Sequence, residues 1–405
     1  MFLTATAEKI CVTLAIAVLL ILSFKMSASN SSGELSVLME PDGTGIWREL
    51  ISEYNAGQPR SKIRLVEGPP ATNAREDLYS TSFLSGKSAF DIVYCDVIWV
   101  AKFAAAGWLG DLTARVSSED RNDWLTAEIQ AGTYRGKLYR IPGFTDAGLL
   151  YYRKDLIASP PSTFEEFSQK ANELKTVDRW GFLWQGKQYE GLITVFLEIL
   201  WGFGGEWIDP ATRQVFLDRP EALRALQFLK DTIGTIAPPG VTGYIEEDTR
   251  ILFQNGYSVF LRNWSYVWTL IAQSRAPVRE KVAIASMPHA SGHSSTAVLG
   301  GWGFALSSFC SDPEGGWQFL QYITGPKQLL RVRERTGRLP ARKSLIPSEL
   351  LPILQKARPR PAIPDYARAS DILQRWLSAA LTGRIGCDEA LREAARETRR
   401  LLKKS

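Results

Sequence analysis

The sequence predicts an α/β protein in which two lobes share one chain. From Glu34 onward, short apolar segments typical of strands alternate with segments of helical periodicity, which indicates parallel strands joined by helices. A hydrophobic content of 45% and a charged content of 22% over 405 residues suit a globular protein of two or three domains. No internal repeat and no Ser/Gly-rich linker divides the chain into independent parts.

The first residues have the pattern of an export segment. Lys9 precedes the apolar run 10–24, and small polar residues follow at 27–33. Such a run suits the core of a signal peptide and is short for a membrane span, which needs roughly 20 residues. We expect residues 1–33 to be a signal peptide or, because Lys25 directly follows the run, an uncleaved anchor. The protein is therefore expected in the periplasm or another extracytoplasmic space.

The spacing of apolar residues predicts alternating strands and helices in the first third of the chain. Thr44 is suited to cap a helix, and Gly86 is suited to end one. In chain order the predicted elements are strand 34–40, helix 44–54, strand 62–68, helix 74–85, strand 90–96 and helix 97–107.

The middle and the end of the chain have their own signals. Residues 136–157 are predicted to form two short strands around a turn, and Ser162 with Glu165 predicts a capping box at the start of helix 162–175. A Gly-Pro pair predicts a break between two helices within 311–337. The other predicted elements are helices near 189–203, 219–233 and 246–256, strands 259–263 and 281–288, an extended Pro-rich segment 357–364, and helices 370–381 and 388–402.

Charge and cysteine usage exclude several classes of protein. The net charge of +5 comes mainly from residues 329–343 and 392–405, which are interpreted as solvated helix faces, and no basic stripe indicates nucleic-acid binding. Cys95, Cys310 and Cys387 are too widely spaced for a disulfide framework, and their pairing is left open. With two His in the chain, no metal site is expected, and no cofactor is expected either.

Four short stretches place aromatic rings or a restricted backbone beside polar groups. They are Phe144-Thr145-Asp146, RNWSY at 262–266, LGGWGF at 299–304 and RPRP at 358–361. None contains a nucleophile with its base or a metal-ligand spacing. A sugar has apolar C–H faces that stack on an indole and hydroxyls that bond to carboxylates and guanidinium groups. The stretches, in a chain with 13 Trp, therefore favour a sugar-binding site.

Each candidate residue also has a structural interpretation. Asp96 follows a buried strand, where open α/β sheets bind ligands, but Asp is also a favoured helix N-cap. Asp146 also suits a turn, and Trp264 also suits the core. Gly300 and Gly301, before Trp302, also suit a hinge of small residues.

Two further candidates have a rival nearby in the sequence. Arg360 lies between two prolines that restrict the backbone, so its planar guanidinium is well placed for a bidentate hydrogen bond. Arg358, two residues earlier, is the alternative to Arg360. Asp42 follows the first predicted strand and competes with Glu40.

These segments resemble the extracellular solute-binding proteins that feed sugar importers of the ATP-binding-cassette (ABC) class, the trehalose/maltose-binding branch above all. The resemblance runs from about Glu34 to the end of the chain. It implies a non-enzymatic, monomeric protein that binds a di- or oligosaccharide or a glycoside, of the trehalose, maltose, sucrose or glucosylglycerol class, and delivers it to a permease. The segments that support it, in order, are 90–112, 141–156, 246–266, 299–307 and 358–366.

The resemblance implies a two-lobe periplasmic-binding-protein fold (type II) with three hinge crossings and a ligand cleft between lobes that closes on the ligand. The first lobe would be 34–144 plus 302–338, and the second 146–300 plus 345–405. The crossings would fall near Phe144-Asp146, Gly300-Trp302 and Leu339-Lys343.

The resemblance also implies roles for single residues. It implies sugar-binding carboxylates at Asp96 and Asp146, a backbone bond from Gly301 and a contact from Arg360. Relatives more often have Tyr or Trp at the position of Phe144, and Pro at that of Ser265, so the stacking ring and the loop differ here. The remaining implied ligand contacts are Asp42, Phe144, Trp264, Tyr266 and Trp302.

An exported glycosidase is the alternative function. It requires two carboxylates about 5–10 Å apart on either side of one bond, one with a raised pKa, and Asp96 with Asp146 is the candidate pair. Turnover of a bound sugar distinguishes this enzyme from a binding protein. A membrane-anchored structural protein is a third class, which the failure to bind any sugar would favour.

Overall fold

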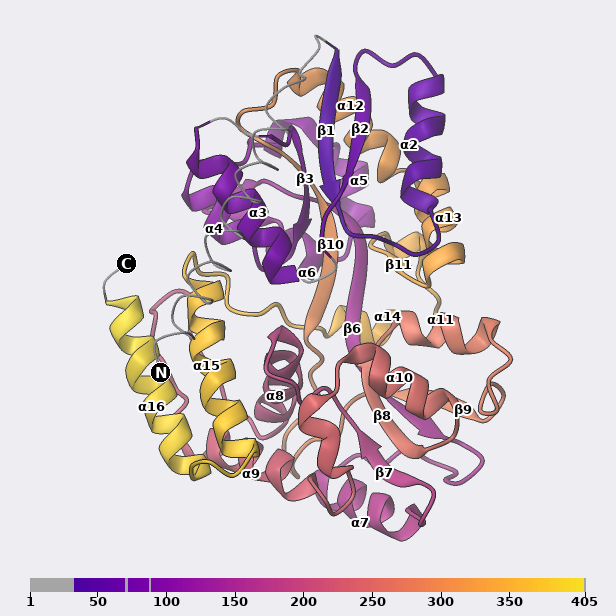
Figure 1. Ribbon diagram of the computed structural model, residues 1–405, viewed down its shortest axis with the longest axis vertical. Coiled ribbons are helices and arrows are strands. Elements are labelled where there is room, and N and C mark those ends of the chain that lie inside the picture. Colours follow the sequence, from indigo (N-terminus) through magenta and orange to yellow (C-terminus); the bar gives the residue numbers. More distant parts are fainter. Residues whose placement is uncertain (1–32, 70–71, 87–88, 404–405) are drawn as a thin grey trace, which may run out of the picture. The chain divides into compact units, whose positions relative to one another are not determined.

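The computed structural model describes residues 33–69, 72–86 and 89–403, which form two compact units of mixed strands and helices (Figure 1). The first unit takes the described residues up to Tyr94 together with Ala305–Tyr322, and the second takes Cys95–Phe304 and the residues from Ile323 onward. The α/β prediction is confirmed. The predicted lobe bounds and crossings remain predictions, and the predicted export segment lies outside the described residues except for Gly33.

The first unit has a parallel core of three strands. β1 pairs with β2 along its whole length and with β3 through Val37 and Leu38, and the pairing is parallel on both sides. Parallel neighbours need a crossover connection, which α2 and α3 provide here. The elements that lie wholly or mainly in this unit are β1 (Glu34–Met39), β2 (Lys62–Glu67), β3 (Ile92–Asp96), α2 (Ile46–Ala56), α3 (Thr72–Leu84) and α12 (Pro313–Ile323).

Two predicted helix caps are wrong by one or two residues. The start of α2 is held by Asp42, whose Oδ2 accepts a hydrogen bond from the backbone of Trp47 at 3.2 Å, and not by Thr44 alone. The start of α7 (Phe164–Leu174) is capped by Thr163 and not by Ser162, since the Thr163 hydroxyl accepts from the backbone of Glu166 at 3.1 Å. Both shifts replace one short polar side chain by a neighbour of similar capping ability.

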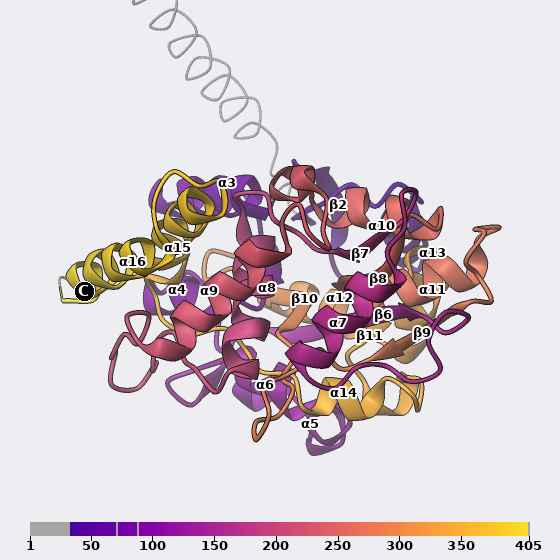
Figure 2. The same ribbon diagram turned by 90° about the horizontal axis from the view of Figure 1, so that it is seen from below.

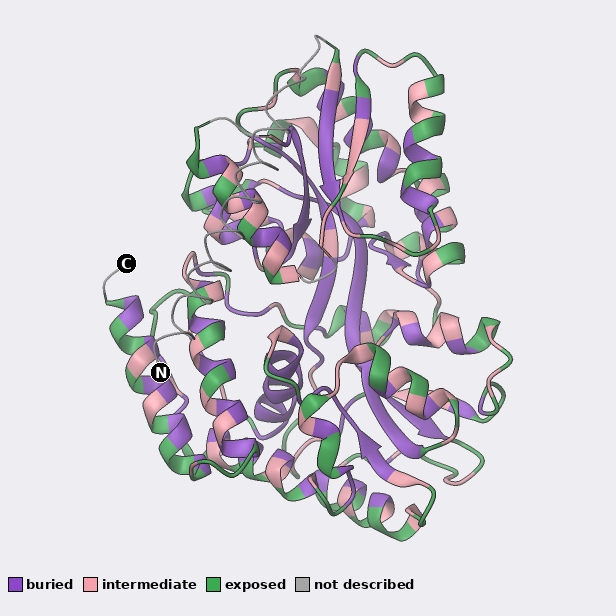
Figure 3. Ribbon diagram, in the orientation of Figure 1, coloured by how far each residue is buried: buried purple, intermediate pink, exposed green. Residues whose placement is uncertain are grey.

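The second unit is built on one long strand. β6 runs from Ile141 to Arg153, and all 13 of its residues are buried (Figure 3). The sequence predicted two short strands around a turn within residues 136–157, and this is wrong because one strand runs without interruption from Ile141 to Arg153. Strands on both sides of β6 complete its hydrogen bonds, which removes the need for a turn.

Different strands pair with the two halves of β6. The first half pairs antiparallel with β10, where Gly300 lies opposite Asp146, and also with β11. The second half pairs antiparallel with β8 and β9, and β7 joins β8 in parallel. The strands of this unit besides β6 are β4 (Thr133–Tyr134), β5 (Lys137–Leu138), β7 (Trp180–Leu183), β8 (Ser258–Trp264), β9 (Val282–Ala285), β10 (Leu299–Leu306, mostly in this unit) and β11 (Leu339–Pro340).

Helices provide most of the core of the second unit. α8 is mostly apolar, with Glu190, Thr194 and Glu198 as its polar residues, and is buried over nearly its whole length (Figure 3). In contrast, α15 and α16 lie side by side with one face exposed (Figures 2 and 3). The helices of this unit are α4 (Val100–Ala105), α5 (Ser118–Asp123), α6 (Thr126–Ala131), α7, α8 (Glu190–Gly202), α9 (Pro220–Thr232), α10 (Glu246–Gln254), α11 (Tyr266–Gln273), α13 (Pro326–Thr336), α14 (Leu351–Gln355), α15 (Tyr366–Leu381) and α16 (Cys387–Leu402).

Two further features are the apolar character of the helices and the state of the cysteines. Within the described ranges, no helix combines the length and the apolar character that a membrane span requires. Cys310 and Cys387 are free thiols in the structure, and the buried Cys95 thiol donates to the carbonyl oxygen of Asp96 at 3.4 Å.

Candidate functional site

Asp146 lies in the middle of β6 with one carboxylate oxygen fully engaged. Its Oδ1 accepts hydrogen bonds from the backbone N–H of Ser265 at 2.6 Å, from the Ser265 hydroxyl at 2.5 Å and from the backbone N–H of Ala147 at 3.0 Å. Within the described part of the chain, no donor bonds to its Oδ2. Burial raises the pKa of Asp146 to about 6, against the effect of these hydrogen bonds. Asp146 is therefore held in place through Oδ1 alone.

Trp264 ends β8 beside this carboxylate. Its indole is partly exposed, its Nε1 donates to Oε1 of Glu246 at 3.3 Å, and the Arg262 guanidinium lies 4.4 Å from the ring centroid. A Cβ on Gly300 would lie 2.9 Å from Cζ3 of Trp264 and 3.3 Å from Cβ of Asp146. Because Gly300 has no side chain, the Trp264 indole and the Asp146 side chain can both lie close to the backbone of β10 at this position.

Gly301 and the rings next to it form the following part of β10. Gly301 has a φ of +147°, and a Cβ there would lie 2.6 Å from Oε1 of Glu128 and 2.7 Å from the carbonyl oxygen of Phe144. Only glycine adopts this backbone without strain. Trp302 lies opposite Phe144 in the strand pairing and meets Trp99 edge to face, with ring centroids 5.1 Å apart.

Phe144 is more enclosed than the two indoles. Its side chain is buried, and the guanidinium of Arg338 lies 4.8 Å from its ring centroid. The ring therefore already has one cation against it, and its predicted stacking on a ligand stays a prediction.

Asp96 and Arg360 lie close together at the end of β3. Nη2 of Arg360 is 3.8 Å from Oδ1 of Asp96, and the backbone N–H of Val97 donates to the carbonyl oxygen of Gly301 at 3.2 Å. Burial raises the pKa of Asp96, and the charge of Arg360 acts in the opposite direction. The structural alternative for Asp96 also holds, since its Oδ1 accepts from the backbone of Ile98 at 3.2 Å. The same carboxylate thus serves the local turn and faces a guanidinium.

Glu190 is a partner of Arg360 that the sequence reasoning missed. Its Oε1 accepts from Nη1 of Arg360 at 2.7 Å and from the Tyr366 hydroxyl, and its Oε2 accepts from the Ser370 hydroxyl at 2.5 Å. Glu190 stands in the first turn of α8, where an acidic residue is ordinary, so no local signal marks it. The guanidinium is held from the Glu190 side, and its Nε is buried without a hydrogen-bond partner.

A second buried ion pair, between Glu128 and Arg140, was also missed. Nη2 of Arg140 lies 2.5 Å from Oε2 of Glu128, and both side chains are fully buried. Burial raises the pKa of Glu128 to about 7 against the charge of Arg140. The pair lies directly beside Gly301, so it belongs to the support of β10.

Three of the residues singled out in the sequence, Tyr266, Asp42 and Glu40, have other partners. The Tyr266 hydroxyl donates to Oε1 of Glu247 at 2.7 Å. Asp42 accepts four hydrogen bonds from its own turn, which lower its pKa against the effect of burial, and its rival Glu40 pairs with Arg75 at 2.9 Å. The predicted ligand contacts of Tyr266 and Asp42 stay predictions.

Arg358, the rival of Arg360, has different surroundings. Its Nη2 lies 2.6 Å from Oε2 of Glu206, and its guanidinium lies 4.5 Å from the ring centroid of Trp201. It lines a surface pocket that none of the predicted site residues lines. The structure therefore brings Arg360, and not Arg358, to Asp96.

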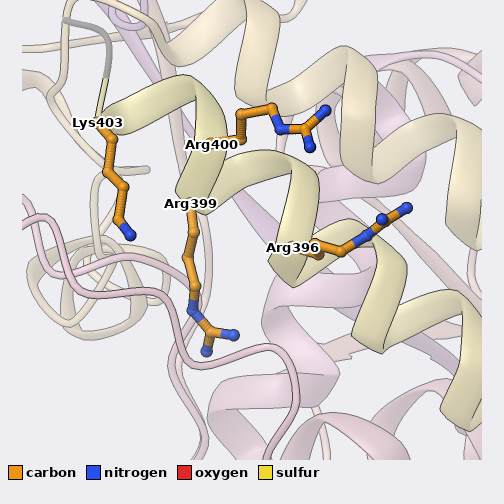
Figure 4. Close-up of a pocket in the computed structure, with 4 residues that line it drawn as sticks. All are labelled: Arg396, Arg399, Arg400 and Lys403. Carbon is orange, nitrogen blue, oxygen red and sulfur yellow. The ribbon is translucent and has the colours of Figure 1, made fainter.

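A second surface pocket is lined by basic side chains that contribute to the net positive charge of the chain. Arg396, Arg399, Arg400 and Lys403, at the end of α16, line it (Figure 4). Arg399 pairs with Asp218 at 2.7 Å, and cations near a helix C-terminus are stabilised by the helix dipole. These side chains fit the predicted solvated helix face.

Comparisons with known proteins agree on one group. The family model described as bacterial extracellular solute-binding protein matches residues 40–329. A probable ABC transporter-binding protein of Deinococcus radiodurans is 33% identical over 280 residues, which is 66% of this chain and 66% of that protein.

Solved structures agree over nearly the whole chain. Maltose-bound T. maritima MalE3 matches with a TM-score of 0.84 and 34% identity, over 91% of this chain and 100% of that one. A solute-binding protein of Agrobacterium radiobacter K84 in complex with ribitol matches with a TM-score of 0.81 and 24% identity, over 92% of this chain and 99% of that one. These matches confirm the predicted two-lobe fold.

Proposed function

The chain belongs to the bacterial extracellular solute-binding protein family, and from this premise we propose that it is the binding component of an ABC sugar importer. It binds a di- or oligosaccharide or a glycoside of the trehalose, maltose, sucrose or glucosylglycerol class. It presents this ligand, unaltered, to the permease subunits in the membrane. The maltose in the T. maritima structure, at 34% identity, supports this class of ligand.

One arrangement supports the proposal more than any other. The half-buried indole of Trp264 and the carboxylate of Asp146 meet at Gly300, and Ser265 holds the carboxylate through Oδ1. An indole face takes the C–H face of a pyranose ring, and the carboxylate Oδ2 accepts a hydrogen bond from a ring hydroxyl. Arg360 beside Asp96 supplies donors for a ligand oxygen.

Isothermal titration of the mature protein tests the proposal. The panel is maltose, trehalose, sucrose, glucosylglycerol and a maltooligosaccharide, with ribitol included because the Agrobacterium protein holds it. We expect saturable binding of at least one glycan. Binding of ribitol alone would move the ligand to the linear polyols, and no binding of any compound would refute the proposal.

The same samples separate a binding protein from a glycosidase. A glycosidase would cleave the glycosidic bond between two carboxylates, one of which acts as an acid. Asp146 has the raised pKa such an acid needs, so the ligand must be recovered and analysed. We expect intact ligand after prolonged incubation with the protein, and released monosaccharide would favour the enzyme.

A further inference from the structure

The Trp264 indole rests on a buried ion pair. Nε and Nη2 of Arg262 donate to the two carboxylate oxygens of Glu198, each at 2.7 Å, and Nη1 donates to Oε1 of Gln185 at 3.2 Å. Arg262 and Gln185 are fully buried and Glu198 is 1% exposed. Each guanidinium nitrogen therefore has an acceptor, and the fork is fixed in one orientation.

The neighbouring backbone makes room for this pair. Gly148 lies opposite Trp264 in the pairing of β6 with β8, and a Cβ on Gly148 would lie 1.8 Å from Oε1 of Glu198 and 2.6 Å from Nη2 of Arg262. No other residue at this position fits without moving the ion pair. The strand thus accommodates two charges directly behind the indole.

The pair contacts both sides of the candidate site. The Arg262 guanidinium lies 4.4 Å from the centroid of the Trp264 ring, and Oε1 of Glu198 also accepts from the backbone N–H of Val298 at 3.1 Å. Val298 directly precedes β10, whose Gly300 packs against the Trp264 ring. One carboxylate therefore links the guanidinium under the ring to the strand at the edge of the ring.

The free energy of burying charges indicates that the Arg262–Glu198 pair orients the Trp264 ring rather than stabilises the fold. Burying an Arg–Glu pair removes two charges from water, and apolar residues of similar size often stabilise a fold as well. A guanidinium on an aromatic face attracts the ring and fixes its plane. The pair thus lies against the indole, whose side chain remains partly exposed.

We propose that Arg262 and Glu198 are positioning residues that hold the Trp264 indole in the orientation needed to stack on a sugar ring. The inference rests on the proposed function. It adds two residues that do not touch the ligand and act only through Trp264.

A double-mutant cycle in ligand affinity tests this role. Arg262→Met is combined with Glu198→Leu, because removing one partner alone leaves a buried charge unpaired. We expect this pair of substitutions to weaken binding about three- to tenfold and Trp264→Ala to weaken it about tenfold. When all three are combined, the loss should match that of Trp264→Ala within about twofold, since the pair acts through the ring.

A matched control separates this effect from the loss of any ion pair. Arg153 on β6 makes a bidentate pair with Asp155, at 2.7 and 2.6 Å, and within the described residues no aromatic ring lies against its guanidinium. Arg153→Met with Asp155→Leu should leave the affinity unchanged. If the variant with Arg262→Met and Glu198→Leu does not fold, a variant with Arg262→Gln and Glu198→Gln keeps polar groups at both positions. This second variant then replaces the first in the double-mutant cycle.

The outcomes are distinct. If the wild type binds no glycan, the proposed function fails and the positioning role with it. If the wild type binds, wild-type affinity in the pair variant, or losses that multiply with that of Trp264→Ala, would overturn the positioning role alone.

Discussion

Trp264 and Trp302 are the two partly exposed indoles of the candidate site, and their loss should weaken binding. Stacking of a sugar on an indole is worth on the order of 1–2 kcal/mol, by analogy with other aromatic contacts, so each Trp→Ala variant should bind about tenfold more weakly. Titration calorimetry measures the effect. Trp376→Ala is the control, because Trp376 is also partly buried but bonds to Glu397 between α15 and α16.

Arg360→Lys should lose more affinity than Arg358→Lys. Arg360 is held by Glu190 and faces Asp96, whereas Arg358 pairs with Glu206 at a surface pocket that Arg360 does not line. A Lys ammonium cannot reproduce the planar fork of a guanidinium. Equal losses in titration calorimetry, or a larger loss for Arg358→Lys, would mean that Arg360 is not the ligand-binding member of the two.

Asp146→Asn should weaken binding and make the fold more stable near neutral pH. The pKa of Asp146 is about 6 in the folded protein and about 3.9 in an unfolded chain. Its contribution to stability is therefore full below about pH 4 and is lost as the pH rises through 6, by up to about 3 kcal/mol. Asn keeps the acceptor oxygen that Ser265 needs and does not ionise.

The measurement for this variant is the melting temperature at several pH values. The difference between Asp146→Asn and the wild type should grow in favour of the variant from pH 4 to pH 7. Because Asp96 and Glu128 titrate in both proteins, the comparison isolates Asp146. A difference that stays constant, or that shrinks with rising pH, would contradict the raised pKa.

At the level of elements, β10 depends on glycine where it passes the site. Gly301→Ala places a Cβ against Oε1 of Glu128 and the carbonyl oxygen of Phe144, in a backbone region that side chains rarely adopt. We expect it to lower both the melting temperature and the affinity. Gly383→Ala is the control, since Gly383 also has a positive φ, of +77°, but open space around it. If Gly301→Ala lowers the melting temperature but leaves the affinity unchanged, Gly301 supports the strand and does not contribute to ligand binding.

The two halves of β6 show why element prediction failed there. Pro142, Gly143 and the TDAG sequence around Asp146 are turn signals when taken alone. In the structure, β10 and β11 pair with this part of the strand and supply its backbone hydrogen bonds. Tertiary pairing therefore overrides the local preference.

For the molecule as a whole, a bound ligand should raise the melting temperature. A ligand that binds only the folded state stabilises it by about 2.7 kcal/mol when present at 100 times its dissociation constant. Differential scanning fluorimetry with the glycan found by calorimetry should show a shift that grows with concentration. If calorimetry shows binding but the melting temperature does not change, the premise that the ligand binds only the folded state is contradicted.

The sequence by itself determined the fold class and most helices and strands, and it singled out most residues of the candidate site, whose contacts with a ligand stay predictions. The fold class and the elements depend on the local periodicity of apolar residues. The candidate site residues were found from short motifs, such as RNWSY and LGGWGF, which combine aromatic, polar and glycine residues. The structure brings Asp96 to Arg360, and it brings Asp146 and Trp264 together at Gly300.

Only the tertiary structure decided which residues support that site. Glu190 reaches Arg360 across 170 positions, and Glu198 reaches Arg262 across 64. Neither glutamate stands out locally, because an acidic residue in a helix is common and its partner is chosen by packing. Asp42 differs, because its carboxylate is engaged locally by its own turn. Contacts between distant residues depend on how the strands pair, and no periodicity in the sequence records that pairing.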